Sequence, residues 1–176
     1  RKESSAASDV YKRQGPWWTW TLAERGFEVY GKEMETWQRE TSERIADISP
    51  CVERIRFVAS GTEATMLCLR AARAANGRAK ILKFEGAYHG QHPEGVTSLV
   101  GSDPPALPQP DPAGTGAPWV ERDVLVAPYN DLAATEQILT DHAADLAAVI
   151  VEPLHRCIPP VDGFLQGLRE VTAKLG

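Results

Sequence analysis

The chain has 176 residues, of which 43% are hydrophobic and 24% are charged, and its net charge is −5. This composition is that of an ordinary globular domain and is too apolar for an intrinsically disordered chain. The acidic balance provides no basic field for nucleic acid, and no apolar run approaches the roughly 20 residues that span a membrane, so neither partner is expected. The three cysteines are far apart and form no Cys-x-x-Cys pair, which favours a reduced, cytoplasmic compartment over a disulfide framework or a zinc site.

The two ends of the chain look incomplete. Residues 1–14 (RKESSAASDVYKRQ) have little apolar periodicity and resemble translated vector sequence, so we expect a non-native or disordered tail; a native, frayed terminus is the alternative. Residues 15–50 are expected to form an N-terminal segment with one helix over 32–48. At the other end the chain stops at Gly176, directly after a helical pattern, so the next strand of an alternating chain is expected to be missing.

Residues 51–176 alternate between strand and helix patterns. Strands are predicted over 54–58, 80–84, 124–127 and 146–151, and helices over 62–76, 132–142 and 163–175. This alternation indicates an α/β fold with a parallel sheet covered by helices. A loop over 101–122 holds six prolines, and a loop of that length is more often functional or mobile than idle.

The first candidate site is Ser60-Gly61-Thr62, between a predicted strand and a predicted helix. The first amides of a helix lack internal partners, and the helix dipole favours an anion there, so this turn could hold a phosphate. A plain capped helix start is the alternative, because Ser-Gly-Thr is also good capping chemistry. The sequence contains no GxGxxG, GxxxxGK[ST] or GxSxG motif, which argues against dinucleotide, P-loop and α/β-hydrolase sites.

Two further candidates follow predicted strands, where ligands of open α/β sheets bind. Tyr88 could stack on a flat cofactor, or simply pack in its loop. Glu152 ends an apolar strand, so its carboxylate should face a cation or a donor unless it is solvated. His89 and His92 form an HxxH pair without a third ligand nearby, which does not favour a metal site.

Five spaced motifs together resemble the class III aminotransferases over roughly residues 42–176, and most closely the glutamate-1-semialdehyde 2,1-aminomutase group. In chain order they are SGTEATM, KILKFEGAYHG, VAPYND, AAVIVEP and PPVDGFLQGLRE. The resemblance implies that residues 51–176 are the first part of the large domain of the pyridoxal 5′-phosphate (PLP) dependent transferase type I fold. It also implies a homodimer in the complete protein, with the active site at the subunit boundary.

The resemblance also implies PLP as the cofactor and assigns residues to it by position. Ser60, Gly61 and Thr62 would hold the phosphate, and Tyr88 would stack on the pyridine ring, with His89 completing that turn. Glu152 would lie near the cofactor or the substrate. The proline-rich loop would lie where the family has a mobile loop over the active site.

The implied reaction transfers an amino group between a small-molecule amino donor and a carbonyl acceptor. No lysine in this chain has the context of the Schiff-base lysine, so we expect a truncated, inactive piece of such an enzyme. The stretch after Glu152-Pro153, LHRCIPP, is shorter than the aminomutase pattern and lacks its cofactor-contacting asparagine, so a class III transaminase subgroup fits equally well. A non-catalytic α/β module that binds a phosphorylated ligand at Ser60–Thr62, and a fragment without function, are the alternatives.

Overall fold

The computed structural model describes residues 27–49, 52, 55–100 and 106–176. The chain divides into two compact units, residues 1–57 and 58–176. In the first unit, α2 (Phe27–Ile48) confirms the predicted helix and begins earlier than expected, and the ring of Trp37 lies 5.7 Å from that of Phe57. The predicted tail over 1–14 lies outside the described residues.

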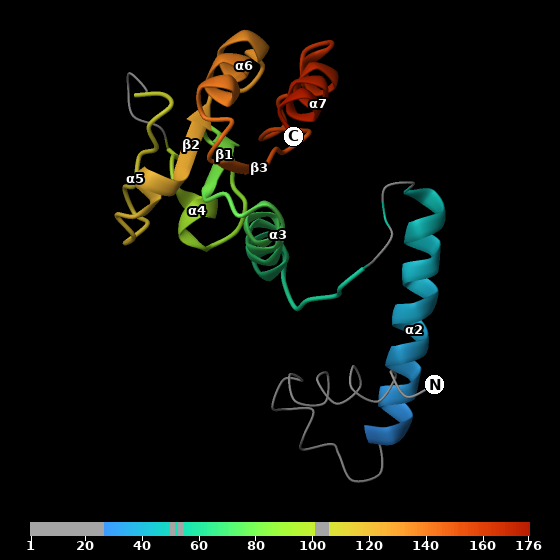
Figure 1. Cartoon of the computed structure of the whole chain (residues 1–176). Coiled ribbons are helices and arrows are strands. Elements are labelled where there is room, and N and C mark those ends of the chain that lie inside the picture. Colours follow the sequence, from blue (N-terminus) through green and yellow to red (C-terminus); the bar gives the residue numbers. More distant parts are fainter. Residues whose placement is uncertain (1–26, 50–51, 53–54, 101–105) are drawn as a thin grey trace. The chain divides into compact units, whose positions relative to one another are not determined.

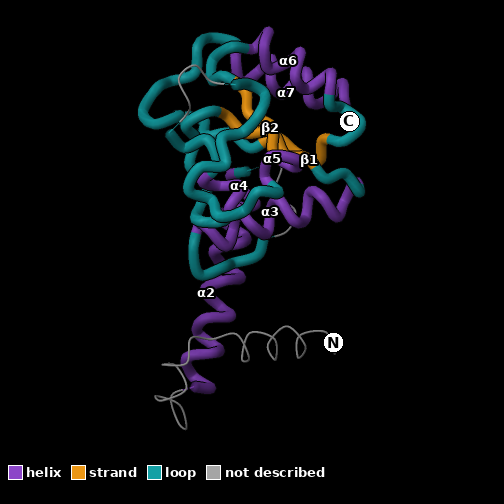
Figure 2. Tube along the Cα trace, turned by 90° about the vertical axis from the view of Figure 1, so that its left-hand side faces the viewer, coloured by secondary structure: helices purple, strands orange, loops and turns teal. Residues whose placement is uncertain are grey.

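The second unit contains a parallel sheet between two layers of helices (Figure 1). Three strands lie in the order β2-β1-β3, and both pairs are parallel. Figures 1 and 2 show α6 and α7 on one face of this sheet and α3 and α4 on the other. The predicted α/β fold with a parallel sheet and flanking helices is therefore confirmed. In chain order the elements are α3 (Gly61–Asn76), β1 (Lys80–Phe84), α4 (Pro93–Val96), α5 (Val120–Asp123), β2 (Val124–Ala127), α6 (Leu132–Asp141), β3 (Leu146–Val149) and α7 (Phe164–Leu175).

Alternation along the strands separates two apolar clusters. Leu82 and Phe84 belong to the core formed with α6 and α7, where the Phe84 ring meets the Phe164 ring edge-on at 5.6 Å. Val124 and Val126 belong to a smaller cluster with α5 on the other side. Both faces of the sheet are therefore covered, which agrees with the apolar strand sequences.

Local capping fixes the helices in the predicted places. The Asp131 carboxylate accepts from the amide of Ala134 at 2.9 Å and starts α6. Gly77, with φ +70°, ends α3 and donates its amide to the carbonyl of Arg73. Only residues 77–79 separate the end of α3 from β1, so α3 must begin near the far, carboxyl end of that strand.

Three sequence predictions need correction. Of the strand predicted over 54–58, residue 54 lies outside the described residues, and residues 55–58 form no strand, because no strand in the described part of the chain pairs with them. The predicted strand over 146–151 ends at Val149. Within the proline-rich segment, α5 begins at Val120, and the carbonyl of Pro108 accepts from the amide of Val126 at 3.0 Å, which ties this segment to the edge of β2.

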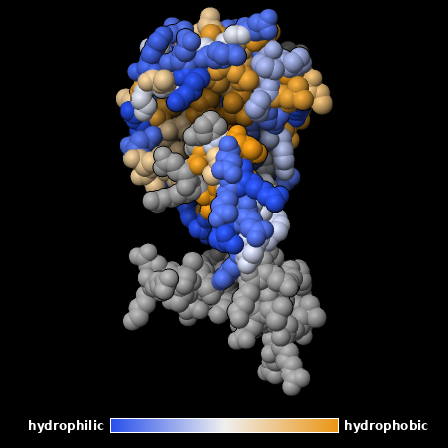
Figure 3. Space-filling model, turned by 90° about the vertical axis from the view of Figure 1, so that its right-hand side faces the viewer, coloured by the Kyte–Doolittle hydropathy of each residue, from blue (hydrophilic) through white to orange (hydrophobic). Residues whose placement is uncertain are grey.

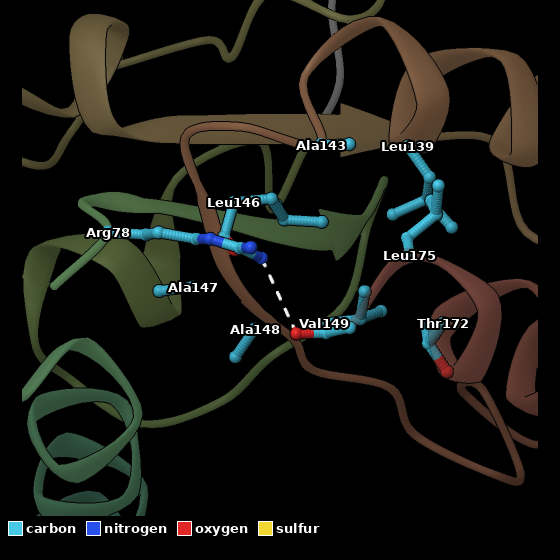
Figure 4. Close-up of a pocket in the computed structure, with 10 residues that line it drawn as sticks. Arg78, Leu139, Ala143, Leu146, Ala147, Ala148, Val149, Thr172 and Leu175 are labelled. Carbon is cyan, nitrogen blue, oxygen red and sulfur yellow. Dashed lines mark hydrogen bonds between the residues drawn. The ribbon is translucent and has the colours of Figure 1, made fainter. Parts of the chain in front are cut away.

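A cavity of about 80 Å³ lies away from the predicted site residues, along β3 and between α6 and α7 (Figure 4). Its lining is largely apolar, and Arg78 Nη1 donates there to the carbonyl of Leu146 at 3.3 Å. Figure 3 shows hydrophobic residues gathered in a hollow of the second unit. Among the described residues, no helix combines the length and the apolarity that crossing a bilayer requires.

Candidate functional site

Three loops meet at the carboxyl edge of the sheet. They are the β1 loop (residues 85–98), the β2 loop (128–131) and the β3 loop (150–163), each of which follows its parallel strand. Because parallel strands all end at one edge, these loops share it with the start of α3. The Tyr129 hydroxyl of the β2 loop donates to the carbonyl of Pro153 in the β3 loop at 3.1 Å. The edge is therefore a continuous surface built from distant parts of the sequence.

The start of α3 presents two amides without partners. Ser60 Oγ accepts from the amide of Glu63 at 3.2 Å, and the Glu63 carboxylate accepts from the amide of Ala59 at 3.0 Å. The amides of Gly61 and Thr62 donate to no group in the described part of the chain. A Cβ placed at Gly61 would meet no atom within 4 Å, so the turn borders open space. Unpartnered amides at the positive end of a helix dipole are what an anion-binding site requires.

The β1 loop crosses to this helix start. The amide of Gln91 donates to Thr62 Oγ1 at 3.2 Å, and the Thr65 hydroxyl donates to the carbonyl of His89. Gly90 allows the close approach, because its φ is +110° and a Cβ there would lie 2.8 Å from the Cα of Thr62. The loop and the helix start are thus in direct contact.

Tyr88 connects the β1 loop with the end of β3. Its amide donates to Glu152 Oε1 at 2.9 Å, and its hydroxyl accepts from Gln91 Nε2 at 2.9 Å. Tyr88 is 42% exposed as a residue, so it is accessible to a ligand. Since Gln91 also contacts Thr62, the structure brings Ser60–Thr62, Tyr88 and Glu152 together. Whether they bind a cofactor stays a prediction.

Glu152 faces donors, as the sequence predicted, but these donors are backbone amides. Oε1 accepts from Tyr88 as described, and Oε2 accepts from the amide of Arg156 at 3.3 Å. His155 Nδ1 lies 4.0 Å from Oε2, and its ring stacks on Tyr129 with centroids 4.6 Å apart. The carboxylate therefore joins the β1 and β3 loops.

His89 is buried inside the β1 loop. Its amide donates to the carbonyl of Gly95 at 3.1 Å, and its Nε2 has no partner in the described part of the chain. Burial, together with the positive charge of Lys83, lowers the pKa of His89 to about 4, although Glu152 opposes this shift. His89 is therefore neutral near pH 7.

The His-x-x-His pair has a structural explanation. His92 Nδ1 accepts from the amide of Gly95 at 3.2 Å, which caps α4, and its Nε2 lies 3.1 Å from Thr65 Oγ1. Glu94, next to the same ring, pairs with Arg73 at 2.8 Å. Within the described ranges, no group of three or more His, Cys, Asp or Glu side chains could hold a metal ion.

The β3 loop contains a tight turn that the sequence did not predict. Arg156 and Cys157 both have left-handed backbone, with φ of +47° and +66°, although neither is glycine. The turn is closed by the amide of Ile158, which donates to the carbonyl of His155 at 2.8 Å. Arg156 Nη2 donates to the carbonyl of Leu99 at 2.9 Å and thereby ties the turn to the residue that directly follows the β1 loop.

Sequence reasoning also missed Lys83, Thr65 and Gln91. Lys83 carried a usable signal, because a lysine inside the apolar strand KILKF must find buried acceptors. Thr65 and Gln91 carried none, because polar residues near a helix start or in a loop are ordinary.

We expect Gly90→Ala to separate the β1 loop from α3. The new methyl group meets the Thr62 backbone, and the positive φ is strained for alanine. Gly114→Ala is the matched control, since Gly114 has φ +78° but no atom within 4 Å of a Cβ. Urea unfolding should show that Gly90→Ala lowers the free energy of unfolding by about 1–3 kcal/mol more than the control does. Equal losses would contradict the close approach.

Stability should fall as the pH drops from about 6.5 towards 4, because His89 takes up a proton more readily in the unfolded chain than in the fold. The loss due to this ring is at most about 3 kcal/mol. His89→Gln should remove that part of the pH dependence in urea unfolding, whereas His142→Gln, at the end of α6, should keep it. An unchanged pH dependence in His89→Gln would show that the ring is not held neutral.

Comparison with known proteins gives one consistent result. Residues 28–176 match the family described as aminotransferase class-III. Over 159 residues the chain is 45% identical to a glutamate-1-semialdehyde 2,1-aminomutase from Dichelobacter nodosus, covering 88% of this chain and 36% of that protein.

Solved structures agree with this match. An omega-transaminase from Sphaerobacter thermophilus superposes with a TM-score of 0.71 at 38% identity, over 77% of this chain and 32% of its own. A transaminase with PLP bound also gives a TM-score of 0.71, at 33% identity, over 79% of this chain and 33% of its own. The chain thus spans about a third of the length of these relatives. Because the family match covers most of its residues, the chain belongs to the class-III aminotransferases.

Proposed function

We propose that this chain forms the part of a PLP-dependent class-III aminotransferase or aminomutase that binds the cofactor phosphate and contacts the cofactor ring. The observation that carries the proposal is the pair of unpartnered amides at Gly61 and Thr62 beside the exposed ring of Tyr88. The complete protein would transfer an amino group between an amino compound and a carbonyl compound and would act as a homodimer.

The residues of this chain fit the two ends of PLP. The amides of Gly61 and Thr62 would donate to the phosphate, and the hydroxyls of Ser60 and Thr62 each have a proton that can be donated while the oxygen accepts its present bond. The ring of Tyr88, steadied by Gln91, offers an apolar face to a flat heterocycle. PLP, when bound, supplies an electron sink for a carbanion next to the amino group, and the protein contributes orientation and electrostatics.

The described lysines do not support a covalent role in this chain. Lys80 begins β1, at the opposite end of the strand from the site, and its Nζ donates to the carbonyl of Arg122 at 2.8 Å. Lys83 is buried among backbone carbonyls, and Lys174 lies in the last turn of α7. We therefore assign binding and orientation to this chain and expect it not to catalyse amino transfer by itself.

Binding of pyridoxamine 5′-phosphate (PMP) tests the proposal. PMP has the ring and the phosphate but no aldehyde, so it cannot react with surface lysines. Titration followed by PMP fluorescence should show saturable binding that inorganic phosphate competes away. Tyr88→Leu should raise the dissociation constant for PMP about tenfold, because loss of one well-placed aromatic contact is worth about 1.4 kcal/mol.

Matched controls separate the outcomes. Trp119→Leu removes an aromatic side chain of similar exposure, 40%, that lies outside the site and should leave PMP affinity unchanged. If phosphate binds but Tyr88→Leu leaves the dissociation constant for PMP unchanged, a non-catalytic module that binds phosphorylated ligands is the better interpretation. If neither PMP nor phosphate binds, the proposed function is wrong.

A further inference from the structure

Strand β1 contains a buried lysine that the proposed cofactor contacts do not use. Lys83 is only 1% exposed although its side chain is charged, and it lies on the middle strand of the sheet. Its neighbours Leu82 and Phe84 face the core with α6 and α7. Since side chains alternate along a strand, Lys83 points to the opposite face of the sheet. That face is the one on which α3 and α4 lie (Figure 2).

The ammonium of Lys83 donates to three backbone carbonyls of the β1 loop. They belong to Ala87 at 2.8 Å, Gly95 at 3.2 Å and Thr97 at 2.5 Å. Ala87 lies on the outgoing arm of the loop, and Gly95 and Thr97 lie on the returning arm. One side chain therefore joins the two arms and uses all three of its N–H groups to do so.

Burying the charged ammonium of Lys83 costs free energy, and its hydrogen bonds to the three carbonyls offset that cost. Burial lowers the pKa of Lys83 to about 8, with Glu152 opposing the shift and Arg156 adding to it. The group is still mostly charged near pH 7. A buried ammonium is stable only when its donors are satisfied, so displacement of either arm would leave a charge without partners.

The position of Tyr88 follows from this tether. Tyr88 comes directly after Ala87, and the next amide, that of His89, donates to the carbonyl of Gly95 at 3.1 Å. Both Ala87 and Gly95 are acceptors of Lys83. We propose that Lys83 is a positioning residue that holds the Tyr88 ring in place for the cofactor ring, acting through the β1 loop and not through contact with the ligand. This inference rests on the proposed function.

Three variants test the inference. Lys83→Met removes every donor, and Lys83→Gln keeps two N–H donors on a shorter, uncharged side chain. Lys80→Met is the matched control, because Lys80 lies on the same strand and also donates to a backbone carbonyl, but outside the β1 loop. For each variant we would measure the dissociation constant for PMP, the inhibition constant of inorganic phosphate, and hydrogen exchange of the amides.

The positioning role predicts a split between ring and phosphate. Lys83→Met should raise the dissociation constant for PMP about tenfold, whereas the inhibition constant of phosphate should stay within about twofold, because the start of α3 is unchanged. Hydrogen exchange should become faster over residues 86–98 but not over 124–139. Lys83→Gln should fall between Lys83→Met and the wild type, and Lys80→Met should match the wild type.

Three results would overturn the inference. The first is PMP affinity that is unchanged in a folded Lys83→Met protein. The second is an equal loss of affinity for PMP and phosphate. The third is failure of both Lys83 variants to fold while Lys80→Met folds, because Lys83 would then serve the whole fold. Failure of the wild-type chain to bind PMP would instead refute the proposed function.

Discussion

Hydrogen bonds from three separate elements hold the β1 loop in place. The Lys83 ammonium binds it from β1, the Glu152 carboxylate from the end of β3, and the Thr62 hydroxyl from α3. These residues are far apart in sequence and meet only because parallel strands end at one edge. A loop without such partners would leave buried backbone groups unsatisfied, so the candidate site depends on this set of contacts.

This constraint fixes the two halves of the site relative to each other. The free amides belong to a helix, and the exposed Tyr88 ring belongs to a loop, yet Gln91 contacts both Thr62 and Tyr88. A ligand with an anionic group and a flat ring would then meet a preformed surface and lose less free energy on ordering the protein. The close approach depends on Gly90, because a Cβ at this position would lie 2.8 Å from the Cα of Thr62.

The sequence predicted those features that depend on local pattern. Apolar runs predicted the strands over 80–84 and 124–127, and capping chemistry predicted the start of α6 at Asp131. Because the carboxyl ends of parallel strands share one edge of a sheet, the sequence also predicted that Tyr88 and Glu152 lie close together. Contacts that depend on tertiary structure were beyond it. The pattern over 54–58 has strand propensity but lacks a pairing partner among the described residues, and the acceptors of Lys83 depend on how the β1 loop returns. The left-handed turn at Arg156 contradicts local propensity, and the bond from Arg156 to the carbonyl of Leu99, far away in sequence, helps to hold it.

An NMR titration of the ¹⁵N-labelled chain with PMP tests most directly whether the start of α3 and the β1 loop form one site. If they do, the amide signals of Gly61, Thr62 and Tyr88 should shift together, with one common dissociation constant, while core signals such as that of Leu139 stay fixed. Shifts confined to Gly61 and Thr62, with Tyr88 unaffected at saturation, would show that the two parts do not form one site.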